Sequence, residues 1–263
     1  MRRRPASRCH GANIIRRWQL VHSRLILRHA GAVLGMTRNV LAADRLVRSG
    51  KFPGWRPVLY GTGVLGKTVG VLGMGKVGQG FARLLSGFNV RMIYYDPVKM
   101  SPVQEAFFGM SRASFEEVLA QSDILVLMLP LNESSIHLIN QQALARMKPG
   151  GYLVNVGRGS VVDEEAVARA LKEGRLAGYA ADVFEMEDLA RADHPLTVHP
   201  GLLADADRTL LTPHLGSAVE KTRLEIELSA ARNIVQALRG ERPADRINDV
   251  SPTTPVNPVP RQH

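Results

Sequence analysis

The sequence has a single cysteine, Cys9, among its 263 residues. One thiol can form neither an internal disulfide nor a cysteine-based metal cluster, so the sequence is not that of a disulfide-rich secreted domain, and we expect a reducing, cytoplasmic setting. Long apolar runs are missing too. The longest, residues 124–131, is far shorter than the roughly 20 residues that cross a bilayer. We therefore expect neither a transmembrane helix nor a membrane partner.

Acidic residues are missing from the first 43 positions, which hold nine arginines. The whole chain carries a net charge of +10, so the other 220 residues carry only +1. The basic character belongs to one N-terminal arm, residues 1–30, and Trp18 is the arm's sole aromatic residue. This pattern argues against a nucleic-acid partner. A transit peptide or an anion-binding arm is the alternative to an unstructured extension.

Apolar residues make up 45% of the chain and charged residues 22%, values typical of a soluble globular protein. Apolar positions recur at helical spacing from about residue 32 to Gly50, which predicts one amphipathic helix. Residues 51–67 follow with four glycines and two prolines, the composition of a connecting loop. A last long helix is predicted for residues 217–238, before a proline-rich tail.

Short apolar segments bounded by turn residues predict six strands. They cover residues 68–72, 90–95, 124–129, 152–156, 178–183 and 209–211. Helices are predicted between them, with starts at Ser114, Asn140 and Asp163. Alternating strands and helices imply parallel pairing with right-handed crossovers. We therefore predict an α/β fold, a doubly wound parallel sheet of the Rossmann type in the strand order three-two-one-four-five-six.

The first predicted strand is joined to a helix by the sequence Gly73-Met74-Gly75-Lys76-Val77-Gly78. In this position a G-x-G-x-x-G pattern is typical of dinucleotide binding, because its glycines allow a tight turn, approach of a pyrophosphate and close packing of helix on strand. Asp96 ends the second strand, where it can bind ribose hydroxyls and repel a 2′-phosphate. The pattern predicts NAD rather than NADP. The alternative is a turn used only for packing.

Polar residues follow three consecutive predicted strands: Arg158 the fourth, Glu185 and Glu187 the fifth, and His214 the sixth. Neighbouring parallel strands end at the same edge of a sheet, so these side chains can converge. Arginine can clamp an oxyanion, histidine can accept a proton, and a carboxylate can hold that histidine. We predict hydride transfer between a nicotinamide cofactor and a small anionic substrate, with Arg158, Glu187 and His214 as the catalytic residues.

Each of these residues also has a simpler interpretation. Arg158 can pair with Asp163, His214 can be a turn histidine, and Glu187 can be a surface residue. Asp182 is predicted to contact the nicotinamide carboxamide or else to hold its own loop. The predicted cofactor-binding residues are Gly73, Gly75, Lys76, Val77, Gly78, Asp96, Pro130, Asp182 and Gly216. His194 and His199 have no third ligand at a suitable spacing, so we predict no metal site.

Four segments, taken in order, resemble the D-isomer-specific 2-hydroxyacid dehydrogenases. They are VGVLGMG (69–75), NVGRGSVVD (155–163), ADVFEME (181–187) and TPHLGSA (212–218). The resemblance implies that Arg158 binds the substrate anion, His214 is the acid/base and Glu187 pairs with it. It also implies a first α/β half that is largely missing here, which leaves a truncated second, substrate domain.

Within the family, residues 47–55, 184–193 and 216–227 are most similar to the phosphite (phosphonate) dehydrogenases. This similarity implies hydride transfer from phosphite to NAD, with water or hydroxide supplying the new oxygen and with Arg223 and Trp55 as substrate contacts. Other members usually have proline where Asp188 stands. For Arg223 the alternative is a surface ion pair with Glu220 or Glu227. The alternative functions are a general D-2-hydroxyacid dehydrogenase and a catalytically impaired NAD-binding fragment or NAD-sensing module.

Three parts follow from these boundaries: the basic arm (1–30), an NAD-binding domain with a leading helix and loop (31–216), and a remnant of the substrate domain (217–263). We expect slow turnover because water enters an open cleft. We also expect a homodimer, since a missing half leaves apolar surface exposed.

Overall fold

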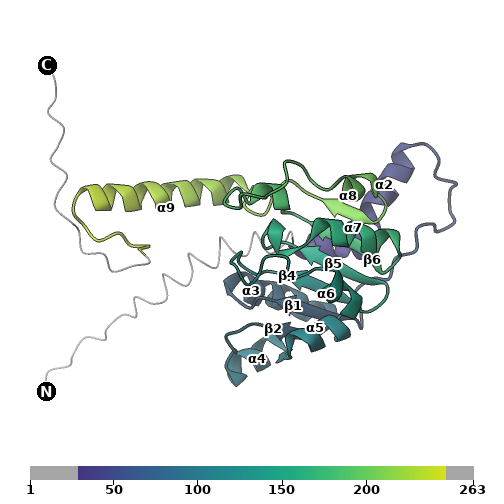
Figure 1. Ribbon diagram of the computed structural model, residues 1–263, viewed down its shortest axis with the longest axis horizontal. Coiled ribbons are helices and arrows are strands. Elements are labelled where there is room, and N and C mark those ends of the chain that lie inside the picture. Colours follow the sequence, from purple (N-terminus) through teal and green to yellow (C-terminus); the bar gives the residue numbers. More distant parts are fainter. Residues whose placement is uncertain (1–28, 247–263) are drawn as a thin grey trace, which may run out of the picture. The chain divides into compact units, whose positions relative to one another are not determined.

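The computed structural model describes residues 29–246 of the chain (Figure 1). The chain divides into two compact units after Gly216. The first unit contains a seven-stranded parallel sheet in the order β3-β2-β1-β4-β5-β6-β7, with helices on both faces. This confirms the doubly wound, Rossmann-type sheet that the alternation of strands and helices predicts.

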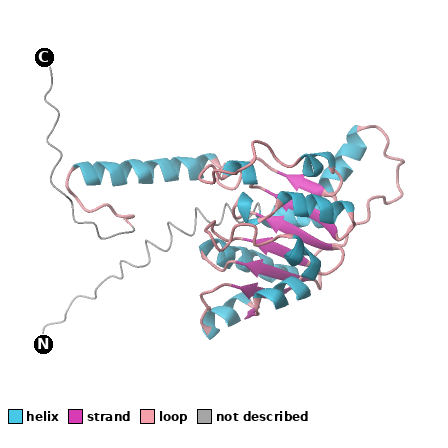
Figure 2. Cartoon of the chain, viewed as in Figure 1, coloured by secondary structure: helices cyan, strands magenta, loops and turns pink. Residues whose placement is uncertain are grey.

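The first strand along the chain, β1 (Thr68–Leu72), lies inside the sheet and pairs with two strands that are distant from each other in the sequence. Its neighbours are β2 (Arg91–Tyr95) and β4 (Ile124–Leu127), followed outward from β4 by β5 (Gly151–Asn155), β6 (Leu176–Ala181) and β7 (Thr209–Leu211). All pairs are parallel, so every strand ends at the same edge of the sheet. Loops leave the sheet at this edge (Figure 2).

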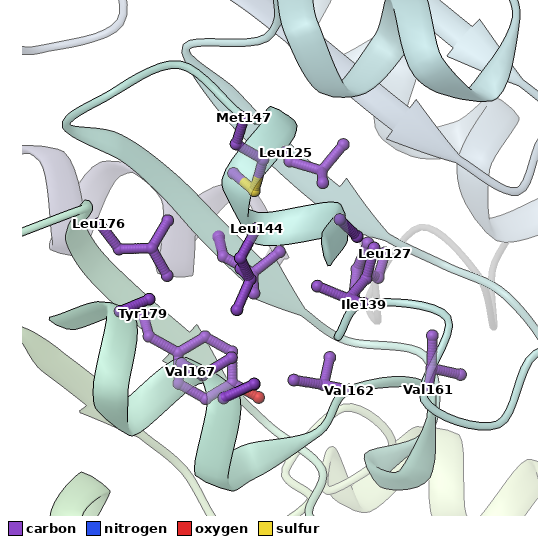
Figure 3. Close-up of a cluster of buried hydrophobic side chains, with 14 of the residues drawn as sticks. Leu125, Leu127, Ile139, Leu144, Met147, Val161, Val162, Val167, Leu176 and Tyr179 are labelled. Atoms are coloured by element: carbon purple, nitrogen blue, oxygen red, sulfur yellow. The ribbon is translucent and has the colours of Figure 1, made fainter. Parts of the chain in front are cut away.

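Alternate residues of the strands pack into two separate hydrophobic clusters, one on each face of the sheet. Val69 and Val71 of β1 belong to one cluster, whereas Leu72 belongs to the other. The second cluster also contains Leu125, Leu127, Leu144, Met147 and Tyr179, all nearly or fully buried (Figure 3). Burial on both faces explains why these strands are almost wholly apolar.

Six helices and three short 3-10 turns connect the strands of the first unit. They are α3 (Lys76–Leu85), α4 (Pro102–Phe108), α5 (Phe115–Gln121), α6 (Gln141–Arg146), α7 (Glu164–Lys172), α8 (Pro200–Ala204), η1 (Ser86–Phe88), η2 (Gly159–Val161) and η3 (Glu185–Glu187). The predicted starts are confirmed, because Ser114, Asn140 and Asp163 each accept a backbone N–H bond of the helix that follows.

One strand, β3, was not predicted. Because it was left out, the predicted strand order is wrong on that side of the sheet. β3 (Met110–Arg112) forms the edge of the sheet and pairs only with β2. The predicted third strand, 124–129, is in fact the fourth and lies beside β1. Three residues with one apolar side chain carry no alternating pattern, so β3 could not be recognised from the sequence.

The predicted single helix of residues 32–50 is also wrong, because the chain breaks it in two. Residues 29–37 are helical and α2 (Val40–Arg48) follows. Between them Asn39 has a φ of 52°, and its Nδ2 donates to the backbone oxygens of Leu59 and Tyr60. Asparagine tolerates this left-handed conformation, and the apolar spacing continues across the break, so periodicity did not reveal it.

The second unit begins at Ser217, and its helix is α9 (Glu220–Leu238). The helix begins three residues later than predicted. Asp245 accepts hydrogen bonds from Ser229 and Asn233, which fastens the chain after α9 to the helix. Within residues 29–246, no helix is both long and apolar enough to cross a membrane. Most of the predicted basic arm and most of the proline-rich tail lie outside the described residues.

Candidate functional site

The turn between β1 and α3 has a shape that fits a dinucleotide. Gly73 has a φ of 98°, and a Cβ there would lie 2.7 Å from the Met128 carbonyl oxygen. A Cβ on Gly78 would collide with the Gly73 carbonyl oxygen, whereas a Cβ on Gly75 would meet nothing within 4 Å. The first and third glycines are therefore required for packing, and the second leaves open space where a pyrophosphate can approach the N-terminus of α3.

Asp96 follows β2 and binds the same turn. Its Oδ2 accepts a hydrogen bond of 2.7 Å from the Met74 backbone N–H, and its Oδ1 one of 2.8 Å from Val98. A carboxylate has about four acceptor positions, so these two bonds leave capacity for ribose hydroxyls. The predicted neighbours are also at this edge: Lys76 and Val77 begin α3, and Pro130 follows β4.

His214 and Glu187 are in direct contact, although they follow different strands. His214 Nδ1 lies 2.5 Å from Glu187 Oε2, and Glu187 Oε1 accepts a 2.8 Å bond from the Phe184 backbone N–H. The His214 side chain is 51% exposed. Because Nδ1 faces the carboxylate, Nε2 is the ring nitrogen from which a proton can pass to a small molecule.

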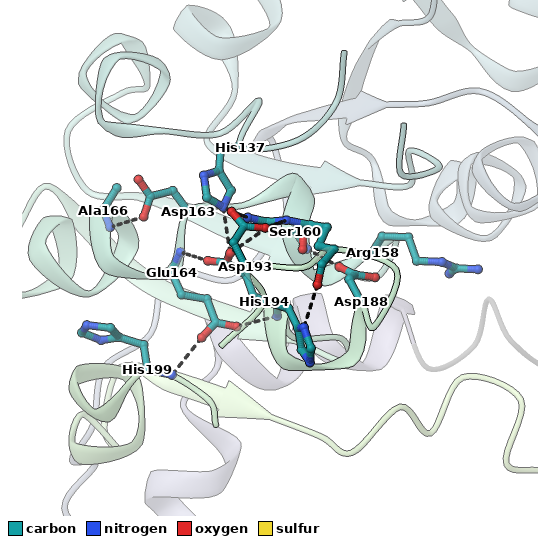
Figure 4. Close-up of polar contacts among 12 residues, drawn as sticks. His137, Arg158, Ser160, Asp163, Glu164, Ala166, Asp188, Asp193, His194 and His199 are labelled. Carbon is teal, nitrogen blue, oxygen red and sulfur yellow. Dashed lines mark hydrogen bonds and ion pairs between the residues drawn. The ribbon is translucent and has the colours of Figure 1, made fainter. Parts of the chain in front are cut away.

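Arg158 lies at the start of η2, in the loop after β5. Its carbonyl oxygen accepts a 2.9 Å bond from Asn155 Nδ2, and its own Nη1 donates to the Gly157 carbonyl oxygen. The alternative ion pair with Asp163 is not formed, because that carboxylate caps α7 through Ala166. Figure 4 shows the Arg158 side chain pointing away from Asp188 and Glu164. The guanidinium is exposed and can reach an anion.

The Arg158 loop packs against the turn that carries Glu187. A Cβ on Gly159 would collide with the backbone carbonyl of Phe184, so only glycine allows this approach. The next residue, Ser160, donates its backbone N–H to Asp188. The structure therefore brings together the two segments that hold Arg158 and Glu187, and His214 joins them through its contact with Glu187.

Asp182 binds the loop that carries His214. It is 7% exposed and accepts bonds from Thr212 Oγ1 at 2.5 Å and from the backbone N–H groups of Leu215 and Gly216 at 2.8 Å. This is the geometry of the alternative interpretation, in which Asp182 holds a loop. The predicted contact of Asp182 with nicotinamide remains a prediction.

A buried ionic cluster lies beside η3. Glu185 Oε2 contacts His137 Nε2 at 2.7 Å and Arg191 Nη1 at 3.1 Å, and its Oε1 accepts from the Glu164 backbone N–H. Burial raises the pKa of Glu164, although backbone N–H groups of His199 and Glu185 lower it in part. Figure 4 shows how Glu164, His137 and Asp193 gather. Sequence reasoning missed this cluster because its members are scattered along the chain.

Trp55 is not brought into this group. Trp55 is 88% exposed, in the loop that leads to the opposite, amino end of β1, and the guanidinium carbon of Arg56 lies 5.5 Å from its ring centroid. Arg223 belongs to the second unit, where its Nη2 lies 3.9 Å from Glu227 Oε1, the ion-pair alternative. Among residues 29–246, no group of three His, Cys, Asp or Glu side chains could hold a metal ion.

Comparison with known proteins identifies the family of this chain. Residues 30–216 match the family described as "D-isomer specific 2-hydroxyacid dehydrogenase, NAD binding domain". A glyoxylate reductase of Thermofilum pendens is 38% identical over 236 residues, which cover 88% of this chain and 67% of that protein. The crystal structure of a glyoxylate reductase from Paecilomyes thermophila superposes with a TM-score of 0.73 and 34% identity, over 82% of this chain and 62% of that one.

A third relative carries ligands. The NADPH-dependent glyoxylate/hydroxypyruvate reductase of Sinorhizobium meliloti, solved with NADP and malonate, has a TM-score of 0.73 and 28% identity, over 82% of this chain and 64% of that one. The chain therefore belongs to the D-isomer-specific 2-hydroxyacid dehydrogenase family and carries the family's NAD-binding domain. It spans about two thirds of the length of these relatives.

Proposed function

We propose that this chain is an NAD-dependent oxidoreductase that exchanges a hydride with a small anion. NAD, when bound, accepts or delivers the hydride. Arg158 binds the anion through its paired N–H groups, and His214 Nε2 gives or takes the accompanying proton. Glu187 holds the imidazole by Nδ1 and stabilises the imidazolium that forms when the proton is taken.

The observation that carries this proposal is the 2.5 Å contact between His214 and Glu187 at the carboxyl edge of an NAD-binding sheet. A turn histidine without a catalytic role needs no carboxylate on its ring, and the Phe184 N–H holds Glu187 Oε1 while Oε2 faces His214. The contact therefore favours an acid/base pair over the simpler interpretations of both residues.

The relatives favour a 2-oxo acid and the corresponding 2-hydroxy acid as the substrate pair. Those named above are reductases of glyoxylate or hydroxypyruvate. Such substrates present a carboxylate to Arg158 and a carbonyl or hydroxyl group to His214. We propose glyoxylate reduction as the reaction to test first.

Phosphite oxidation is the second candidate, and it is favoured by the segment from Phe184 to Asp193 that resembles phosphite dehydrogenases. Phosphite is also a small anion that suits Arg158. Its oxidation needs a new P–O bond, for which water supplies the oxygen, and His214 is placed to take the proton that water releases. Arg223 remains a proposed substrate contact of this reaction, whereas Trp55, in the loop that leads to the amino end of β1, is no longer proposed as one.

Both candidates are tested by one set of measurements on the full chain. NADH consumption with glyoxylate and NADH formation with phosphite distinguish the two substrates. We expect His214→Ala to reduce either rate by a factor of about 10² to 10⁴ while NADH affinity stays within about twofold, because the imidazole moves a proton and does not hold the cofactor.

The matched control is His194→Ala, which removes a partly buried histidine whose Nδ1 lies 2.7 Å from the Arg191 carbonyl oxygen, outside the proposed machinery. An undiminished rate in the His214 variant would remove this residue from the mechanism. NADH binding without turnover of either substrate would instead favour the NAD-sensing module.

A homodimer is proposed as well. α2 and the loop after it expose several large apolar side chains, such as Val47 (61%), Trp55 (88%) and Tyr60 (84%). A second copy of the chain could cover this surface.

A further inference from the structure

We propose that Asp188 is a positioning residue that sets the place of Arg158 relative to the Glu187–His214 pair. Asp188 Oδ2 accepts a 2.7 Å hydrogen bond from the backbone N–H of Ser160, which lies 28 residues earlier in the chain. Ser160 is fully buried and lies two residues after Arg158. The bond therefore joins the loop that holds the arginine to the turn that holds the acid/base pair.

Asp188 can act in this way because it is itself fixed to Glu187. The two residues are adjacent, and they close the same turn: the Glu187 N–H donates to the Phe184 carbonyl oxygen at 3.0 Å, and the Asp188 N–H donates to that of Glu185 at 3.2 Å. The Phe184 N–H in turn donates to the Glu187 carboxylate. A displacement of Asp188 would therefore also displace Glu187 and His214.

Among residues 29–246, the Arg158 side chain has no hydrogen bond or ion pair to another part of the fold. Its guanidinium donates to the carbonyl oxygen of Gly157, its own neighbour in the chain. The loop backbone is anchored by Asn155, which donates to the Arg158 carbonyl oxygen and accepts from the Gly157 N–H. Asn155 ends β5 and Asp188 follows η3, and the His137 N–H also donates to the Ser160 carbonyl oxygen at 2.8 Å, so the loop is held at several points. The bond from Asp188 is the one that joins the loop to the turn of Glu187.

Neither the Ser160 side chain nor Gly159 can replace the bond between Asp188 and the Ser160 N–H. The Ser160 hydroxyl oxygen is buried and has no hydrogen-bond partner among the described residues, so the side chain does not anchor the loop. Gly159 allows the close approach to Phe184, and its carbonyl oxygen accepts from the Val162 N–H within the same loop, so it does not bond to the turn of Glu187. Without the Asp188 carboxylate, the buried N–H of Ser160 would lack an acceptor, which favours a rearrangement of the loop.

The inference rests on the proposed function, since it assigns a consequence for anion binding. Three variants of the full chain are compared with the parent: Asp188→Ala, which removes the acceptor; Asp188→Asn, which keeps a carbonyl oxygen; and Asp207→Ala. Asp207 is the control because its side chain is 88% exposed and pairs with Arg45 at the surface.

Three kinds of measurement are made on each variant. Calorimetry records the binding of NADH, and then of oxalate to the NADH complex, because oxalate is a small dianion that takes part in neither proposed reaction. Hydrogen exchange records the protection of the backbone in residues 158–162. Substrate KM and kcat are determined for glyoxylate and phosphite wherever the parent turns them over.

We expect Asp188→Ala to weaken oxalate binding by at least about tenfold and to raise substrate KM more than it lowers kcat. Exchange in residues 158–162 should accelerate, whereas NADH affinity and the pH profile of kcat should stay as in the parent. Asp188→Asn should restore most of the anion affinity, and Asp207→Ala should behave as the parent does.

The proposal is overturned if exchange in residues 158–162 is unchanged in Asp188→Ala, or if it accelerates while oxalate affinity is unchanged. Parallel loss of NADH affinity would indicate a general structural role and would overturn it too, as would an Asp188→Asn variant as impaired as the alanine variant. If the parent binds no oxalate and turns over neither substrate, the proposed function fails, and exchange alone then decides whether Asp188 anchors the loop.

Discussion

At the scale of single residues, the polar groups of the proposed site each have a partner that determines their orientation. His214 meets Glu187, and Asp96 meets the glycine-rich turn. Residue types and their positions after strands were enough to predict the first contact, because the sheet brings neighbouring strand ends together. The role of Asp182 was left open, since the same carboxylate can bind a ligand or accept hydrogen bonds from its own loop. Only coordinates show that three donors of its loop already occupy it.

His29 is a buried histidine that makes the fold sensitive to acid. Its side chain is almost completely buried, its Nδ1 has no hydrogen-bond partner among the described residues, and burial lowers its pKa to about 4 although nearby Asp182 raises it in part. In the unfolded chain the pKa of histidine is near 6.5. Between these values the unfolded chain binds a proton that the folded chain does not, so the free energy of unfolding decreases as the pH falls.

We expect His29 to account for a loss of up to about 3 kcal/mol in the free energy of unfolding between pH 6.5 and pH 4. Urea denaturation of the parent and of His29→Gln at several pH values isolates this contribution, because titrating carboxylates affect both proteins alike. The difference between the two proteins should change with pH in this window and stay constant above it. Parallel curves throughout would contradict the assignment.

At the scale of elements, close backbone packing positions the site together with the side-chain bonds. η2 and η3 carry Arg158 and Glu187, and they can approach because Gly159 has no side chain. Gly159 was predicted only as part of a motif that resembles the family, and its contact with Phe184 could not be inferred from periodicity. The same holds for β3, which is too short to show a pattern.

The substitution Gly159→Ala should separate the two turns. Gly159 does not have a positive φ, so the expected effect is steric: the methyl group collides with the Phe184 carbonyl, which costs about 1–3 kcal/mol in the free energy of unfolding. Anion binding should weaken together with stability. Gly87→Ala is the control, because a Cβ on Gly87 meets nothing within 4 Å and its φ is not positive. Equal stability of both variants would show that the two turns adjust without strain.

At the scale of the whole chain, both hydrophobic clusters are built from residues of the first unit. Their buried members lie between Ala30 and Leu202, and the partly buried residues that join them extend to Leu211. The range of residues that build the two clusters was predicted well, because the alternation of strands and helices is the most regular pattern in the sequence. The break at Asn39 could not be predicted, because one left-handed residue leaves the apolar spacing intact.

A chain that ends at Gly216 should therefore fold and bind NADH. It keeps both hydrophobic clusters, the glycine-rich turn, Asp96 and the contact between His214 and Glu187. We expect cooperative thermal unfolding and an NADH dissociation constant within about threefold of the full chain, because the dinucleotide contacts of this fold come from the sheet edge. Calorimetry measures both. A truncated chain that unfolds without cooperativity would show that residues 217–263 contribute to the core.

The pairing of β1 with both β2 and β4 determines when the sheet can assemble during synthesis on the ribosome. Thr68–Leu72 finds its first neighbour about 20 residues later, but its other side stays open until Leu127 has left the exit tunnel. After that point β5, β6 and β7 add at one edge in the order in which they are translated. Until β4 arrives, a strand whose residues are all buried in the finished sheet has an exposed edge, and in that interval a nascent chain is most in need of a chaperone.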